Sequence, residues 1–144
     1  MIMAGVNVAD PRQSIQDNVK LEGDTLTVCG DAFSLKDYDR VLLFGAGKAA
    51  TPMCQAFERI LKPDDGLVIT KIGEEICIAD VETIAVRRAY HPEPRAENAK
   101  YSREILDRID GIADGEKVLV FLMISGGGSA LLSCAPAAVG VEDR

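Results

Sequence analysis

The sequence predicts an α/β protein: a Rossmann-like parallel sheet with helices on both faces, preceded by an N-terminal β-hairpin. Short apolar runs alternate along the chain with longer segments whose apolar residues recur at helical spacing. This alternation is typical of parallel strands joined by crossover helices. Two of the apolar runs end in glycine-rich turns, and the 47% hydrophobic and 27% charged residues are ordinary for a globular protein.

Residues 1–36 are expected to lead into the main fold, which would occupy residues 37–144. A short helix is predicted over Ser14–Lys20. Two β-prone runs, Thr25–Cys29 and Ala32–Leu35, then predict a hairpin whose two-residue turn is Gly30-Asp31.

The main fold is expected to contain four principal strands and two long helices. The strands are Val41–Phe44, Leu67–Thr70, Thr83–Ala89 and Val118–Ile124, with a further short strand at Ile76–Ile78. The first helix runs to about Leu61 with Pro52 in its first turn, and the second covers Ala96–Ile109 with an apolar stripe of Ile105, Leu106 and Ile109. The unbroken apolar run Val118–Ile124 predicts a strand buried on both faces. Because little sequence follows it, we expect the α/β domain to be incomplete.

The strongest candidate site follows the last predicted strand. It consists of Ser125, Gly126, Gly127, Gly128 and Ser129. Glycines let a backbone turn sharply and approach a ligand closely, and Ser129 is expected to cap a helix that begins at Ala130. A strand, a glycine turn and a helix N-terminus together predict a cradle for an anion. The alternative is a tight turn that binds no ligand.

A second glycine turn follows the first strand of the main fold and carries Gly45, Gly47 and Lys48. Ligands of open α/β sheets bind beyond the carboxyl ends of the strands, so both turns are expected at the same edge. Lys48 stands among small residues and could direct its ammonium group towards an anion; the alternative is a solvated lysine. His91, the single histidine, follows the third strand and is expected to line the same edge.

Several classes of function are disfavoured. The turn at Gly45–Lys48 lacks the spacing of a P-loop, and its dinucleotide fingerprint is incomplete because Lys71, not an acidic residue, follows the second strand. A net charge of −7 argues against nucleic-acid binding. The four cysteines show no zinc-ligand spacing and are expected to be buried free thiols, so we predict no metal cluster. Without a signal peptide or an apolar run that could span a membrane, the expected location is the cytoplasm.

Four segments together resemble the N-terminal domain of the glycerate 2-kinase family, whose members are also labelled hydroxypyruvate reductase. They are FGAGKAATPMCQAFE, GLVITKIG, YHPEPR-x-EN and VLVFLMISGGGSALL. The resemblance implies phosphorylation of D-glycerate to 2-phosphoglycerate with ATP and Mg²⁺. It makes Lys48 an active-site residue and places Ser125–Ser129 in the same cleft. Family members continue into a second domain that forms the other wall of the cleft, so the chain alone is expected to be inactive.

Two other interpretations stay open. Sugar-phosphate-binding modules of the sugar isomerase type also place a glycine turn after one strand and a phosphate loop after another, although that loop is rich in serine and threonine rather than glycine. The chain could instead be a non-catalytic remnant, in which an uncovered apolar surface would favour a homodimer.

Overall fold

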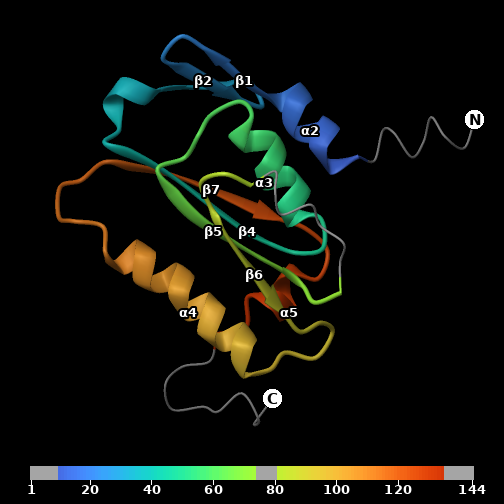
Figure 1. The fold of residues 1–144 in the computed structure, drawn as a ribbon. Helices are drawn as coiled ribbons and strands as arrows, with labels where there is room; N and C mark the ends of the chain where they lie inside the picture. Colours follow the sequence, from blue (N-terminus) through green and yellow to red (C-terminus); the bar gives the residue numbers. More distant parts are fainter. Residues whose placement is uncertain (1–9, 74–80, 135–144) are drawn as a thin grey trace, which may run out of the picture.

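The computed structural model describes residues 10–73 and 81–134 (Figure 1). The N-terminal part contains α2 (Pro11–Asn18), β1 (Val19–Glu22), β2 (Thr25–Val28), β3 (Asp31–Ser34) and a short 3₁₀ turn (Leu35–Asp37). The main fold contains β4 (Arg40–Ala46), α3 (Ala50–Glu58), β5 (Asp65–Lys71), β6 (Ala85–Ala89), α4 (Ala96–Asp110), β7 (Val118–Ile124) and α5 (Gly128–Leu131). The short strand predicted at Ile76–Ile78 lies outside the described residues.

The main sheet is parallel and has the strand order β6-β5-β4-β7. Figure 1 shows α3 on one face and α4 on the other. Side chains alternate between the faces of a strand, so Leu43 joins the core beneath α3 while Leu42 and Phe44 join the core beneath α4. Buried helix residues that meet these two cores include Phe57 of α3 and Ile105 of α4. The predicted fold class is therefore confirmed.

The N-terminal strands form a separate antiparallel sheet in the order β1-β2-β3. The predicted hairpin is present, but its turn is Cys29-Gly30, because Val28 pairs with Asp31. Both turn residues have positive φ, 51° for Cys29 and 96° for Gly30, as a tight hairpin turn requires. Cys29 is consequently exposed, which corrects the expectation that all the cysteines are buried. Cys54 is buried as expected, and burial raises the pKa of its thiol.

The first helix begins earlier than predicted, at Pro11, and ends at Asn18. The Asp10 carboxylate accepts the backbone N–H of Arg12 at 2.9 Å, which caps the helix, and proline at the first helical position needs no hydrogen bond for its nitrogen. Lys20 belongs to β1 and not to the helix. The strand β1 was not predicted from the sequence.

The strand β6 begins at Ala85, two residues after the predicted start at Thr83. The buried carboxylate of Glu58 in α3 accepts the backbone N–H groups of Thr83 at 2.9 Å and Ile84 at 3.2 Å. These amides therefore bind a helix side chain instead of the neighbouring strand. The Glu58 side chain therefore connects α3 to the residues that lead into β6.

The strand β7 has the predicted bounds, but it is not buried on both faces. The side chains of Val120, Leu122 and Ile124 are 42%, 55% and 49% exposed. The reason is that β7 lies at the edge of the sheet, a position that hydrophobic periodicity does not reveal. The stripe predicted on α4 is uncovered in the same way, since Leu106 and Ile109 are 37% and 38% exposed while Ile105 is buried.

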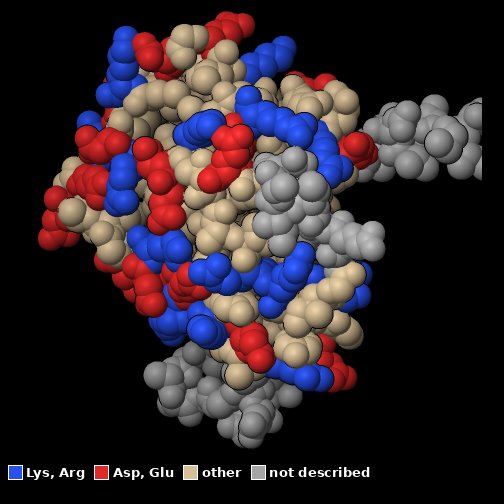
Figure 2. Space-filling view, in the orientation of Figure 1, with Lys and Arg blue, Asp and Glu red and all other residues tan. Residues whose placement is uncertain are grey.

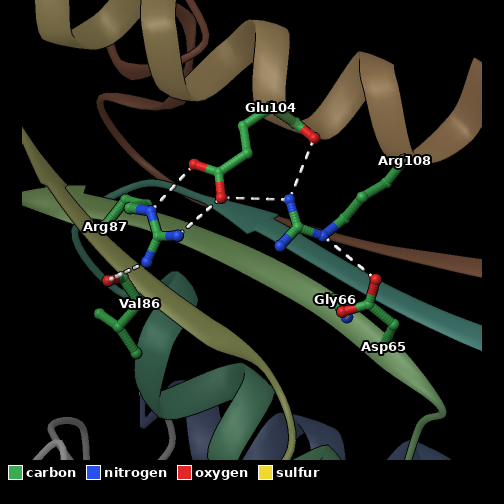
Figure 3. Close-up of polar contacts among 6 residues, drawn as sticks. All are labelled: Asp65, Gly66, Val86, Arg87, Glu104 and Arg108. Carbon is green, nitrogen blue, oxygen red and sulfur yellow. Dashed lines mark hydrogen bonds and ion pairs between the residues drawn. The ribbon is translucent and has the colours of Figure 1, made fainter.

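A cluster of charged side chains anchors α4 to the sheet (Figure 3). Arg87 of β6 donates two hydrogen bonds to the Glu104 carboxylate, at 2.9 and 2.6 Å. Arg108 Nη1 lies 3.3 Å from Glu104 Oε1, and Arg108 Nε donates to Asp65 Oδ2 of β5 at 3.1 Å. The hydrogen bonds from Arg87, followed by those from Arg108, hold the pKa of Glu104 below its usual range.

Elsewhere on the face seen in Figure 2, basic and acidic side chains are interspersed. No helix within residues 10–73 and 81–134 has the length and apolar character needed to cross a membrane.

The depressed pKa of Glu104 predicts an acid-dependent loss of stability. The ionised carboxylate contributes fully above the usual glutamate pKa of about 4.3, and its contribution is lost as the pH falls through the lowered folded-state value. Glu104→Gln should lower the free energy of unfolding at pH 7 by up to about 1 kcal/mol, since the cluster is partly exposed. Urea unfolding between pH 7 and pH 3 should then show a shallower decline for this variant than for the parent. Asp107→Asn, at an exposed position of the same helix, is the control and should keep the parent's decline; equal declines for all three proteins would contradict the prediction.

The hydroxyl of Thr51 predicts a stabilising substitution. Thr51, in the first turn of α3, is fully buried, and its Oγ1 has no hydrogen-bond partner in the described part of the chain. Thr51→Val removes the unpaired hydroxyl at nearly constant shape and should raise the free energy of unfolding by about 1 kcal/mol, measured by urea unfolding. Thr70→Val is the matched control, because Thr70 is as fully buried but is not left without a partner. That control should be destabilised; destabilisation of Thr51→Val as well would show that its hydroxyl is satisfied.

Candidate functional site

The two glycine turns meet at the point where the strand order reverses. From β4 the chain adds β5 and β6 on one side of that strand within the sheet. It then returns to place β7 on the other side of β4. The order β6-β5-β4-β7 corresponds to the first four positions of the doubly wound order 3-2-1-4-5-6. In such sheets ligands bind in the crevice beyond the carboxyl ends of the strands at this reversal. The turns after β4 and β7 lie side by side at this reversal.

Hydrogen bonds join the two turns directly. The backbone N–H of Lys48 donates to the Gly126 carbonyl at 3.0 Å, and that of Ala49 donates to the Ser125 hydroxyl at 2.9 Å. The Ser125 N–H donates to the Ala46 carbonyl at 3.1 Å. The expectation that both turns project from one edge is confirmed. The two turns form one hydrogen-bonded unit, in which the Ser125 side chain links them.

Gly47 has to be glycine because of the closeness of the second turn. Its φ of +134° is unfavourable for other residues, and a Cβ at this position would lie 2.1 Å from Ser125 Oγ. Gly45 has a different place, inside β4 rather than in the turn. A Cβ there would meet Cys54 Sγ at 3.0 Å, so its small size serves the packing of α3 on the sheet.

The helix that follows the second turn begins earlier than the sequence suggests. Gly127, with a φ of +85°, is the residue before α5, and the helix comprises Gly128–Leu131. Ser129 is therefore inside the helix, and the prediction that it is the N-cap is wrong. The left-handed conformation at Gly127 lets the helix begin two residues sooner than a cap at Ser129 would. A Cβ on Gly128 would lie 3.0 Å from the Ala46 carbonyl oxygen, which fixes α5 close to the end of β4.

The loop after β6 brings His91 to the second turn. A Cβ on Gly127 would lie 2.7 Å from His91 Nε2, so the imidazole occupies the space that a larger residue would need. The structure thus groups His91 with Gly127 at the same edge of the sheet. This is the position expected from the sequence.

Asn98 holds this arrangement and was not singled out in the sequence. It is fully buried in the first turn of α4. Its side-chain oxygen accepts the N–H groups of Tyr90 at 3.1 Å and Arg95 at 3.0 Å, and its nitrogen donates to the carbonyls of Tyr90 at 2.8 Å and Ala130 at 3.0 Å. One side chain therefore joins the His91 loop to α5. The available signal was its place at the third position of a helix behind a proline-rich loop.

The open side of the joined turns is suited to an anion. Within the described residues, the backbone N–H groups of Gly126, Gly127 and Ser129 donate to no protein acceptor. A Cβ on Gly126 would meet nothing within 4 Å, so there is room above this amide. Lys48 is exposed, and its ammonium group has no ion-pair partner in the described part of the chain. Free N–H donors next to an open space, with a lysine in the adjoining turn, are features that favour phosphate or carboxylate binding.

Metal ligands do not gather in the same way. Over residues 10–73 and 81–134, no group of three or more histidine, cysteine, aspartate or glutamate side chains could hold a metal ion.

The fold and the paired turns define a Rossmann-like α/β protein in which two joined glycine turns and an exposed lysine lie at the strand reversal. The chain belongs to a family described as a domain of unknown function (DUF4147), whose profile matches residues 1–144. The glycerate 2-kinase of Pyrococcus horikoshii is 32% identical over 143 residues, which cover 99% of this chain and 31% of that protein.

Two solved structures resemble the chain. A crystal structure of a Pyrococcus horikoshii protein gives a TM-score of 0.81 at 34% identity, covering 94% of this chain and 29% of the other. The crystal structure of a glycerate kinase from Thermotoga maritima gives 0.71 at 26% identity, covering 99% and 30%. The resemblance found from the sequence motifs is confirmed, and the chain spans about a third of the length of these relatives.

The hydrogen bonds of Asn98 predict a large effect of its removal. Asn98→Ala would leave buried backbone groups of the His91 loop and of α5 without partners, so we expect a loss of about 1–3 kcal/mol in the free energy of unfolding. Asn18→Ala is the matched control, since the exposed Asn18 side chain makes one hydrogen bond, to the Ser14 carbonyl. Urea unfolding compares the two variants, and equal losses would show that Asn98 is not the link between the loop and α5.

Proposed function

We propose that the chain forms one wall of the active site of a glycerate 2-kinase, which phosphorylates D-glycerate to 2-phosphoglycerate with ATP. The observation that carries the proposal is the pair of joined turns: within the described residues the N–H groups of Gly126 and Gly127 are free in one turn, and the other turn carries the exposed Lys48, whose backbone N–H binds Gly126. The relatives named glycerate 2-kinase or glycerate kinase support the choice of reaction. Because the chain spans 31% of the Pyrococcus relative, the facing wall would come from residues beyond the match.

The residues fit a phosphate or carboxylate group better than they fit a metal ion. The open space above Gly126 would take an anionic oxygen without displacing any protein atom within 4 Å. The family resemblance implies Mg²⁺, but the described residues offer no cluster of three ligands for it. We therefore assign the chain a role in binding anionic groups of ATP or glycerate and derive no step through the metal.

In the proposed reaction, this wall would position an anionic group of the substrates and neutralise its charge. ATP, when bound, supplies the phosphoryl group. The N–H groups of Gly126, Gly127 and Ser129 would orient a phosphate or carboxylate, and Lys48 would offset the negative charge of the transferring group. Catalysis of phosphoryl transfer depends mainly on such fixed electrostatic contacts. His91 would border the bound anion through its place beside Gly127.

A pair of variants tests the anion site. Gly126→Ala adds a methyl group to the open space, so it should leave the urea midpoint unchanged and weaken binding of 2-phosphoglycerate at least about tenfold, a loss of about 1.4 kcal/mol. Lys48→Ala should weaken binding by about 10- to 100-fold through loss of a charged hydrogen bond. Lys20→Ala, at an exposed position of β1, is the control and should bind as the parent does. Calorimetric titration gives the affinities, and unchanged affinity in both site variants would refute the site.

Turnover tests the reaction itself. The chain should form no ADP or 2-phosphoglycerate from Mg-ATP and D-glycerate when assayed alone, since one wall of the cleft is not enough. A chimera that continues into the remaining part of the Pyrococcus relative should form both products, and Lys48→Ala in that chimera should abolish their formation. Turnover by the chain alone would refute the proposal that the active site needs a second wall from residues beyond the match. An active chimera unaffected by Lys48→Ala would refute the role of the lysine.

A further inference from the structure

The strand β7 has an open edge within the described residues. It pairs with β4 along its whole length, from Arg40 opposite Val118 to Ala46 opposite Ile124, and no other strand of the part of the chain that is described adjoins it. The doubly wound order continues with a parallel strand at this position. The open edge is thus the place where the sheet is expected to continue.

The backbone of β7 presents unused hydrogen-bonding groups along this edge. The N–H groups of Lys117 and Ser125 are both directed to the β4 side, where they donate to Asp39 and to the Ala46 carbonyl. Successive residues of a strand alternate in direction, so the amides of Val120, Leu122 and Ile124 point to the open edge. These three amides can bind a further strand without any change in β7.

The side chains next to the open edge are apolar on both faces of the sheet. On the α4 face, a hollow of about 280 Å³ is lined by residues that include Ile109, Val120 and Leu122. On the opposite face, a hollow of about 300 Å³ between α2 and β7 is lined by residues that include Val19, Phe121 and Met123. A strand added at the edge sends alternate side chains to the two faces, so each hollow would receive apolar side chains from it.

We infer that the open edge of β7 and its two flanking hollows are the docking surface for the part of the family fold that lies beyond the match. The occupant is a strand parallel to β7 that is apolar on both faces, accompanied by a helix whose apolar stripe covers Leu106 and Ile109. The length of the relatives argues for this occupant, because about two thirds of their polypeptide lies outside the matched region. The strand order argues for its position.

A second copy of the chain fits this edge less well. Two copies related by a twofold axis would bring their β7 strands together antiparallel, whereas the doubly wound order calls for a parallel strand. The parallel strand of a crossover unit also brings its own helix to the sheet, and the exposed stripe on α4 requires such a helix.

Co-expression tests the surface. The chain is produced together with an affinity-tagged polypeptide comprising the part of the Pyrococcus relative outside the match, and recovery of the chain with the tag is measured. We expect the parent to be recovered and Leu122→Arg to reduce recovery at least about tenfold, since a charge would replace an apolar group that the complex buries. Ile72→Arg is the matched control, because Ile72 is 43% exposed and directly follows β5, away from the proposed docking surface. This variant should leave recovery unchanged. Equal recovery of Leu122→Arg and Ile72→Arg would overturn the proposal.

Hydrogen exchange distinguishes strand addition from simple apolar contact. The amides of Val120, Leu122 and Ile124 should exchange at least about tenfold more slowly in the complex than in the chain alone, because pairing satisfies them. The covalent chimera with the same polypeptide gives a second measurement if the separate polypeptide is insoluble. Exchange at these amides that is as fast in the complex or in the chimera as in the chain alone would overturn the proposal. Slow exchange in the chain alone, with dimers that Leu122→Arg dissociates, would assign the surface to a second copy instead.

Discussion

The pairing of β4 with β7 is the contact on which the rest of the structure depends. It joins residues that lie 78 apart in the sequence, such as Arg40 and Val118, and it brings the two glycine turns into hydrogen-bonding distance. Gly47 permits this approach because a Cβ there would collide with Ser125. The exposed lysine and the free amides of the two joined turns follow from how these two strands end. The geometry of the site is thus set by the sheet and not by flexible loops.

Much of the fold could be predicted from the sequence because the apolar runs are short and sharply bounded. The bounds of β7 were predicted correctly, since a polar Lys117 precedes the run and Ser125 follows it. Its exposure was not, because a run of apolar residues does not reveal how many strands flank it. The start of β6 was predicted too early for a similar reason. The Glu58 carboxylate, distant in sequence, takes the hydrogen bonds that a strand would have used.

The candidate site could be located from the sequence, although its internal contacts could not. Glycine turns after buried strands are visible in the sequence, and topology brings them together. The cap of α5 was misassigned because a serine signal competed with a left-handed Gly127, and backbone conformation decided between them. Asn98 escaped notice because its role depends on Tyr90 and Ala130, which lie in segments that only the fold brings together.

The late position of β7 in the chain has a consequence for folding during synthesis. β4, β5 and β6 lie within residues 40–89, so they can associate while β7 at 118–124 is still unmade. Until it arrives, one edge of β4 has no partner, and the amides of Lys48 and Ala49 lack the turn to which they donate. The joined turns are therefore the last part of the main sheet to assemble during synthesis. Parallel pairing across such a separation is also slow to form, so a nascent chain passes through a stage in which the apolar strand β4 is not yet covered by β7.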